Sequence, residues 1–210
     1  CNSLALSNAR EESDIDFFII TQKNRIWSTR FFVTAIAHIA GLRRHNKKIQ
    51  NRVCLSFYIS EGALDLENIL FKNDIYFFYW FANLYPLYDR KNTFEKFWNE
   101  NLWLYERLPN IFFRAPSLRR SVSGHWIKNM IIRLGEIVSG SLFGEIIEKI
   151  LKKAQMKKIL KNNKSAFHSH DTRVIASDSM LKFHENDRRK MYRDSWNKNM
   201  EKYIFLSGNQ

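Results

Sequence analysis

Two short apolar runs near the start of the chain are separated by a segment with helical periodicity. Residues 16–20 (DFFII) and 52–59 (RVCLSFYI) are rich in aromatic and β-branched side chains, which is typical of buried strands. Between them, apolar residues recur at helical spacing over residues 26–42, and Gly41 stands near the expected end of this helix. Because strand–helix–strand units cross over right-handedly, the two strands are expected to be parallel in one sheet.

Beyond residue 60 the apolar pattern becomes predominantly helical. Helices are expected over four segments, residues 74–84, 93–104, 126–160 and 187–203. Gly140 and Gly144 are expected to divide the longest of them into two helices. Residues 167–175 are polar and are expected to form a loop. We therefore predict a sheet-containing unit at residues 1–60 and a mostly α-helical region at residues 61–210.

The composition indicates a folded chain. Of the 210 residues, 45% are hydrophobic, which is enough for a buried core and argues against intrinsic disorder. Two cysteines, Cys1 and Cys54, do not make a disulfide framework or a thiolate metal site, so a cytoplasmic setting is expected. The longest uncharged apolar stretch, residues 75–88, is shorter than the about 20 residues of a membrane-spanning helix, and no transmembrane segment is expected. Because the chain opens with Cys1 in what reads as the end of a strand, we expect it to lack its natural N-terminus.

The chain is strongly basic, with a formal net charge of +13. This charge favours anionic partners, namely nucleotides, nucleic acid or a lipid surface, without selecting among them. The lysines of residues 149–164 are expected to form the solvated face of a core-packed helix. The apolar face opposite them consists of Ile146, Ile150, Leu151 and Ile159. No RNA- or DNA-binding motif accompanies the lysines, so nucleic acid is a partner that no motif supports.

Two acidic residues stand side by side at the start of the first strand. Asp14 and Asp16 are separated by one residue, so their side chains leave the same face of the strand while Ile15 points to the other. Two neighbouring carboxylates repel each other unless a cation lies between them. Carboxylate oxygens suit Mg²⁺, which completes its shell with water and substrate phosphates. We therefore predict that Asp14 and Asp16 bind magnesium.

The segment SLALSNAREESDIDFFI resembles the signature of the polymerase-β-like nucleotidyltransferase superfamily. In that family an apolar residue, a glycine and a glycine or serine precede a spacer, an Asp-x-Asp pair and an apolar strand. Here Asn2 and Ser3 stand at the glycine and serine positions, and Ser13 directly precedes the acidic pair. The likeness covers residues 2–20 and extends as topology to residue 60. Residues 181–196 (LKFHENDRRKMYRDSW) also resemble the tails of larger bacterial proteins with such a domain, without implying a chemistry.

The resemblance implies both a fold and a chemistry. The fold is expected to be α/β (α+β), a small mixed sheet with flanking helices at residues 1–60, followed by helices that complete the cleft. Asp14 and Asp16 are implied as the catalytic residues and as the ligands of one or two Mg²⁺ ions. The implied nucleotide-binding residues are Asn2, Ser3 and Ser13. The implied reaction transfers a nucleoside monophosphate from a nucleoside triphosphate to a hydroxyl acceptor, whose identity stays open.

Two basic residues follow the first strand. Lys23 and Arg25 lie just beyond its C-terminal end, where ligands gather in open α/β sheets, so they are candidates to hold the β- and γ-phosphates. The alternative is that they are solvated charges at a strand end.

Two departures from the family pattern bear on activity. Asn2 replaces the usual glycine, although asparagine tolerates the positive φ that such a loop requires. The third carboxylate, which active members usually carry on the later strand, is not evident, because residues 52–59 offer Ser56 and no acid. Either Glu61 or Asp65 takes its place, or the acceptor supplies the base, or catalysis is weak.

These observations leave three hypotheses for the function. The first is a magnesium-dependent nucleotidyltransferase, and the second is a catalytically weakened domain of the same fold that senses nucleotides or binds a partner. The third is a basic RNA-binding protein. The aromatic run at residues 76–81 is expected to pack in the core rather than to stack on bases. The late histidines and aspartates are expected to belong to a polar loop rather than a metal site, because their spacing does not place them on one element. They are His168, His170, His184, Asp171 and Asp187.

Overall fold

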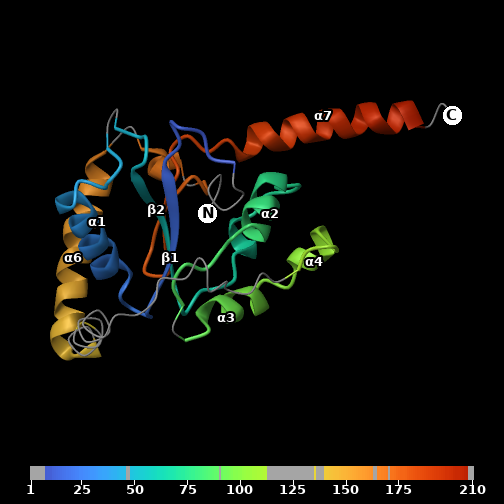
Figure 1. The fold of residues 1–210 in the computed structure, drawn as a ribbon. Helices are drawn as coiled ribbons and strands as arrows, with labels where there is room; N and C mark the ends of the chain where they lie inside the picture. The colour runs from blue at the N-terminus through green and yellow to red at the C-terminus, as the bar shows by residue number, and fades with distance from the viewer. Residues whose placement is uncertain are drawn as a thin grey trace.

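A four-stranded mixed sheet is the central feature of the fold (Figure 1). The structure is a computed structural model, and it describes residues 8–45, 48–89, 91–112, 135, 140–162, 165–169 and 171–207. Helices flank the sheet, and the C-terminal part of the chain is largely helical. The α/β (α+β) fold class with a small mixed sheet is thereby confirmed.

The first three elements follow the predicted order. Strand β1 (Ile15–Thr21), helix α1 (Ile26–Ile39) and strand β2 (Val53–Ser60) succeed one another along the chain. β1 and β2 are parallel, as expected, with Asp16 opposite Cys54. The register shifts by one residue just after this pair, so β2 carries an extra residue there, as in a β-bulge.

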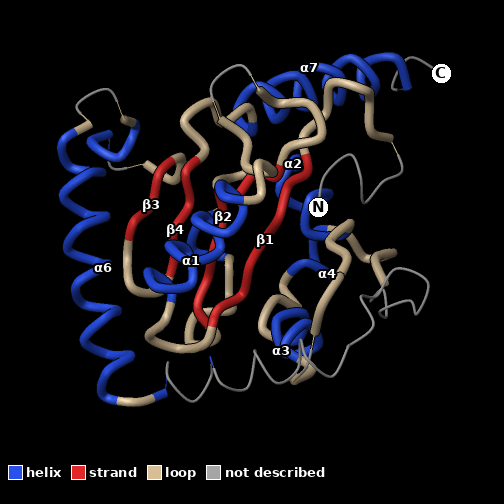
Figure 2. The backbone as a smooth tube through the Cα atoms, turned by 60° about the vertical axis from the view of Figure 1, so that its left-hand side comes forward, coloured by secondary structure: helices blue, strands red, loops and turns tan. Residues whose placement is uncertain are grey.

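Two short strands late in the chain complete the sheet, in the order β1-β2-β4-β3 (Figure 2). β4 (Met180–Phe183) pairs antiparallel with β2, and β3 (Val174–Ala176) pairs antiparallel with β4. The prediction of a loop over residues 167–175 is wrong at its end, since the turn η3 (Ala166–Ser169) is followed by β3. Strands of three and four residues are too short to show a periodicity. The boundary at residue 60 therefore does not separate the sheet from the later region.

Helices cover both faces of the sheet (Figure 1). α1 and α6 (Leu142–Lys161) pack on one face. The turn η2 (Glu67–Ile69) and the helices α2 (Ile75–Ala82) and α3 (Thr93–Asn99) lie on the other. The core on this second face is mainly aromatic and includes Phe57, Phe77, Phe78, Phe81 and Phe97. The prediction that the aromatic run at residues 76–81 packs in the core is confirmed for its three buried phenylalanines.

Two helices differ in extent from the expectation. The helix predicted over residues 93–104 ends at Asn99, and a separate short helix, α4 (Leu104–Arg107), follows it. The last helix, α7 (Arg189–Ser207), extends away from the body of the molecule (Figure 1). Among the described residues, no helix is long and apolar enough to cross a bilayer.

Helix α6 begins at Leu142, two residues after Gly140 and near the predicted break, but it continues through Gly144, so the expectation that Gly144 also divides the helix is wrong. Ser141 caps it, because its side chain accepts a hydrogen bond from the Gly144 N–H. The predicted apolar face of α6 is wrong at two positions, since Ile146 and Ile150 are 55% and 61% exposed. The part of the helix that packs on the core lies further along.

Helix α6 also caps the N-terminus of α1. The Glu148 carboxylate accepts hydrogen bonds from the backbone N–H groups of Trp27 and Ser28, each at 2.8 Å. These N–H groups lie in the first turn of α1, where no helical carbonyl accepts them. A carboxylate at this position also suits the positive end of the helix dipole. The contact joins the start of α1 to α6, although the residues are more than a hundred positions apart in the sequence. It thereby holds the two helices together on their face of the sheet.

Candidate functional site

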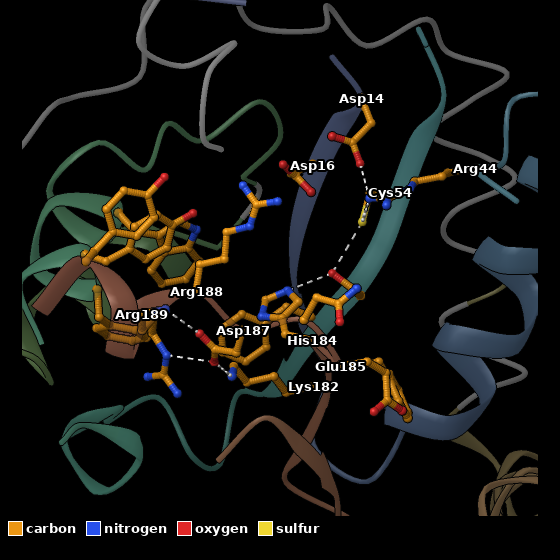
Figure 3. A pocket seen from close by; sticks show the side chains of 18 residues that line it. Asp14, Asp16, Arg44, Cys54, Lys182, His184, Glu185, Asp187, Arg188 and Arg189 are labelled. Atoms are coloured by element: carbon orange, nitrogen blue, oxygen red, sulfur yellow. Dashed lines mark hydrogen bonds and ion pairs between the residues drawn. The ribbon is translucent and has the colours of Figure 1, made fainter. Parts of the chain in front are cut away.

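A row of polar side chains crosses one face of the sheet (Figure 3). The row consists of Asp14 and Asp16 at the start of β1, Cys54 and Ser56 on β2, and Lys182 and His184 on and just after β4. Alternate residues of neighbouring strands share a face, which is why these positions meet. With α2 and the first turns of α7, the row lines a pocket of about 670 Å³, hereafter the first pocket.

The two predicted acids lie together in this pocket. One oxygen of Asp14, one oxygen of Asp16 and the Cys54 sulfur all lie within 4.8 Å of one another. Within the described ranges this is the group of side chains arranged to hold a metal ion. The two carboxylates fit Mg²⁺, whereas a thiol is a poor ligand for that ion and suits softer metals.

Cys54 stands beside the acidic pair, opposite Asp16 in the strand register. Burial raises the pKa of the Cys54 thiol to about 11, and the neighbouring Asp16 and Asp14 act in the same direction. Its sulfur lies 3.4 Å from the Ser56 hydroxyl. The thiol is therefore protonated at neutral pH and carries no negative charge into the pocket.

Arg44, from the loop before β2, forms an ion pair with Asp14. Its Nη1 lies 2.5 Å from Asp14 Oδ2, and the two side chains are 44% and 19% exposed. Burial lowers the pKa of Arg44, but the charge and hydrogen bond of Asp14 outweigh it, so the net shift is upward. At this exposure the pair adds little stability, and its main effect is to neutralise part of the acidic charge.

A cationic wall faces the acidic pair across the first pocket. Lys182, Arg188 and Arg189 line it, and the Arg188 side chain reaches toward Asp16 (Figure 3). Lys182 is almost fully buried, and burial lowers its pKa to about 8, with the charge of Arg189 acting in the same direction. Lys182 and Arg189 are ion-paired with Asp187, which lines the same wall. The carboxylates of Asp14 and Asp16 on one side and the Arg188 guanidinium on the other match a ligand that carries both a metal ion and phosphate groups.

Aromatic side chains border the same pocket. The rings of Tyr76 on α2 and Tyr192 on α7 are stacked, with centroids 5.2 Å apart and an interplanar angle of 18°. Tyr76, Trp80 and Tyr192 all line the pocket. The aromatic run of α2 therefore has two sides, one in the core and one facing the pocket.

The two basic residues predicted to hold phosphates lie at the wrong end of β1. Asp16 is at the start of the strand, whereas Lys23 and Arg25 follow its end, about 20 Å away at 3.3 Å per residue. The stem of Lys23 lies beside Gly62, and the Arg25 guanidinium donates to the Asn24 carbonyl. Neither lines the first pocket. The acidic pair lies at the opposite end of β1 from the strand end where ligands usually gather, so the structure does not bring Lys23 and Arg25 together with it.

The two candidates for the third carboxylate lie at that distant end as well. Glu61 directly follows β2, and Asp65 accepts hydrogen bonds from the Glu67 N–H and the Trp103 indole. Neither belongs to the group formed by Asp14, Asp16 and Cys54, so among the described residues neither of the two candidates supplies the third acid there.

The predicted nucleotide-binding loop is described only in part. Asn2 and Ser3 lie outside the described residues. Ser13 closes a turn, since its hydroxyl accepts from the Arg10 N–H at 3.0 Å and its own N–H donates to the Arg10 carbonyl. It precedes the first pocket without lining it.

Several pocket residues were missed by the sequence analysis. They are Arg44, Lys182, His184, Arg188 and Tyr192. Most of them come from the segment at residues 181–196. The only sequence signal for this segment was the density of charged residues directly after the apolar residues Met180 and Leu181. Its position in the sheet was not predictable without β4.

His184 lies in the first pocket and not in a metal site with the other late histidines. Its Nε2 is 2.9 Å from the Ser56 hydroxyl, and its ring meets the edge of Phe57. His168 is exposed, and His170 lies outside the described residues. Burial lowers the pKa of His184 to about 4, and the charges of Lys182 and Arg189 act in the same direction.

The lowered pKa of His184 makes the free energy of unfolding depend on pH. Between pH 6.5 and the folded pKa of about 4, the unfolded state binds a proton at His184 that the folded state does not, so stability falls as the pH falls. From pH 7 to pH 4.5 we expect a loss of about 2 kcal/mol from this residue. Urea unfolding at both pH values checks it: His184→Gln should show a smaller loss than the wild type. His168→Gln, which removes an exposed imidazole, is the matched control, and an equal loss in all three proteins would contradict the assignment.

The comparisons with known proteins add no relative. No family model matches the chain, and no curated protein and no solved structure shows a significant similarity to it. The resemblance to the nucleotidyltransferase superfamily therefore stays a prediction, which rests on the residues themselves.

Proposed function

We propose that the first pocket binds a nucleoside triphosphate with Mg²⁺ and transfers its nucleoside monophosphate to a hydroxyl acceptor. The observation that supports this most is the arrangement of two carboxylates facing a cationic wall across a cavity of about 670 Å³. A cavity of this size accommodates a nucleotide. The Asp-x-Asp pair at the start of an apolar strand is the element that the sequence shares with the superfamily.

Asp14 and Asp16 are the residues that would hold the metal. Bound Mg²⁺ neutralises phosphate charge and polarises the α-phosphoryl group. Their oxygens lie close enough to share an ion. Arg44, ion-paired with Asp14, offsets part of the negative charge of this carboxylate.

The remaining pocket residues have roles that follow from their chemistry. Arg188 is positioned to bind phosphate oxygens, whereas the Lys182 ammonium is held by Asp187 and the Thr172 carbonyl. The rings of Tyr76 and Trp80 offer an aromatic surface for the base. In the reaction the acceptor oxygen forms a bond to the α-phosphorus, the bond to the β-phosphate bridging oxygen breaks, and pyrophosphate leaves. The acceptor hydroxyl gives up its proton in this step.

Among the described residues, no third carboxylate lies beside Asp14 and Asp16 to accept that proton. Cys54 stands where a third acid would be expected, and its thiol is protonated. The pocket's other carboxylates are occupied: Glu185 bonds to Ser165 and the Ala166 N–H, and Asp187 bonds to Lys182 and Arg189. This observation favours the second candidate function, a catalytically weakened domain that binds the nucleotide as a sensor or as part of a partner-binding module.

Both candidates require metal-dependent nucleotide binding. We expect calorimetry to detect binding of ATP in the presence of Mg²⁺ and a loss of about tenfold or more in affinity when Mg²⁺ is chelated. Asp14→Ala should reduce binding to the level seen without metal. The control is Glu11→Ala, which removes the same charge from an exposed site three residues earlier. An ATP affinity that changes neither on removal of Mg²⁺ nor in Asp14→Ala would refute the proposal. The basic RNA-binding hypothesis would then be the one that is left.

A further inference from the structure

A second cavity lies between α1 and β2, below the loop that joins them. Its volume is about 360 Å³. Basic side chains line it from two sides: Arg30 from α1, and Arg43, Arg44 and His45 from the loop. Thr34 and Ser56 add hydroxyl groups to the lining, and Cys54 and Ser56 are shared with the first pocket. We call it the arginine pocket.

The charged side chains that line the arginine pocket are all basic. Of the described residues that line it, none is acidic. Arg44 has a partner, Asp14, at the border with the first pocket, but Arg30 and Arg43 repel each other across the cavity. Cations held together in a partly enclosed space raise the local potential and attract an anion.

Arg30 is the most constrained of these side chains. Its guanidinium lies 4.4 Å from the centroid of the Phe183 ring and donates a hydrogen bond to Gln155. Its Nε is buried and has no hydrogen-bond partner in the part of the chain that the structure describes. Burial lowers the pKa of Arg30, and the charge of Arg43 acts in the same direction. A buried donor without a partner carries a desolvation cost that a ligand acceptor would remove.

We propose that the arginine pocket is an anion site that binds the phosphate group of a small phosphorylated molecule. Guanidinium groups bind tetrahedral oxyanions through paired hydrogen bonds. Two or three of them together suit a doubly charged phosphate better than they suit a singly charged carboxylate ligand. The cavity is larger than a phosphate ion, and Val53, Leu55 and Phe183 add an apolar wall. The ligand is therefore a phosphate monoester with an organic body.

This site does not depend on the nucleotidyltransferase proposal. Of the candidate metal ligands Asp14, Asp16 and Cys54, only Cys54 lines it, so it is expected to bind phosphate without Mg²⁺. The first pocket also contains cations, and the experiment must tell the two apart. Arg188 lines only the first pocket, and Arg43 lines only the arginine pocket, which provides the distinction.

The test is calorimetric titration of the whole chain with inorganic phosphate and with phenyl phosphate, in the presence of a metal chelator. We expect both to bind, phenyl phosphate more tightly because its ring meets the apolar wall. Arg43→Gln and Arg30→Gln should each weaken binding by about tenfold or more. Arg107→Gln, at an exposed site on α4, is the control and should bind as the wild type does. Arg188→Gln reports whether the anion occupies the first pocket instead.

The outcomes separate cleanly. Loss of binding in Arg43→Gln with retention in Arg188→Gln supports the site. Absence of binding in the wild type, or loss in Arg188→Gln with retention in Arg43→Gln, overturns it, the latter because the anion then occupies the first pocket. If Arg30→Gln fails to fold by circular dichroism, Arg43→Gln decides alone, since Arg43 is a partly exposed residue of the loop before β2 and not part of α1.

Discussion

Replacing Asp16 by asparagine is expected to reduce pyrophosphate release by about 10²-fold or more, the largest functional effect of any single change in the first pocket. Asparagine keeps the size and shape of the side chain but removes the charge that holds Mg²⁺. Asp16 lies on β1 opposite Cys54 and close to the Asp14 carboxylate, so no other described acid can take over its role. The measurement is the release of pyrophosphate from ATP with a panel of hydroxyl acceptors.

Glu12→Gln is the matched control for this variant. It removes one carboxylate from the exposed turn just before β1 and leaves the pocket unchanged. Equal rates in Asp16→Asn and the wild type would refute metal-dependent catalysis at this site. A wild type that binds ATP with Mg²⁺ but releases no pyrophosphate with any acceptor would instead favour the sensor, in agreement with the protonated thiol of Cys54.

The start of the chain shows how far sequence patterns reach in this protein. β1, α1 and β2 were predictable because each is long enough for its periodicity to be read. The placement of Asp14 and Asp16 on one face followed from strand geometry alone, and the structure brings their oxygens together.

The other half of the first pocket was not predictable in the same way. Lys182 belongs to a strand of four residues, and a buried lysine in MLKF contradicts the expected apolar pattern. The position of β4 beside β2 is a long-range pairing, which no local periodicity encodes. Lys23 and Arg25 were misplaced because a general rule about strand ends was applied to an acidic pair at the opposite end of β1. Local patterns thus identified the acids, and tertiary pairing supplied their cationic counterpart.

The cationic wall is held by a buried ion-pair network around Arg189, and disrupting this network is expected to have the largest effect on stability. Arg189 and Asp74 are 4% and 0% exposed, and Arg189 Nη1 lies 2.8 Å from Asp74 Oδ2. The same guanidinium bonds to Asp187, at 2.8 Å, and to the Thr172 hydroxyl, at 2.7 Å. Asp187 in turn binds Lys182, so the network joins α2, β4 and the start of α7.

Arg189→Met is expected to lower the free energy of unfolding by about 3–5 kcal/mol, because it leaves Asp74 buried without its cation. Burial already raises the pKa of Asp74 despite the charge of Arg189, which shows how much this carboxyl relies on its partner. Asp74 also caps α2 by accepting a hydrogen bond from the Phe77 N–H. A change at Asp74 therefore also affects the start of α2, which carries part of the aromatic core. Urea unfolding measured at neutral pH gives the value.

Arg193→Met is the matched control for this effect. Arg193 is one turn further along α7, lies over the same Phe71 ring as Arg189, and forms an ion pair only with the exposed Asp194 among the pairs seen in the described residues. Its loss should cost less than about 1 kcal/mol, as for surface pairs. In the double variant Arg189→Met/Asp74→Asn, the cost should be smaller than the sum of the two single costs, because no uncompensated charge is left at position 74. Additive costs, or equal costs for Arg189→Met and Arg193→Met, would show that burial of the pair contributes nothing. Strand β4 and the segment that carries Arg188 would then be held by other contacts.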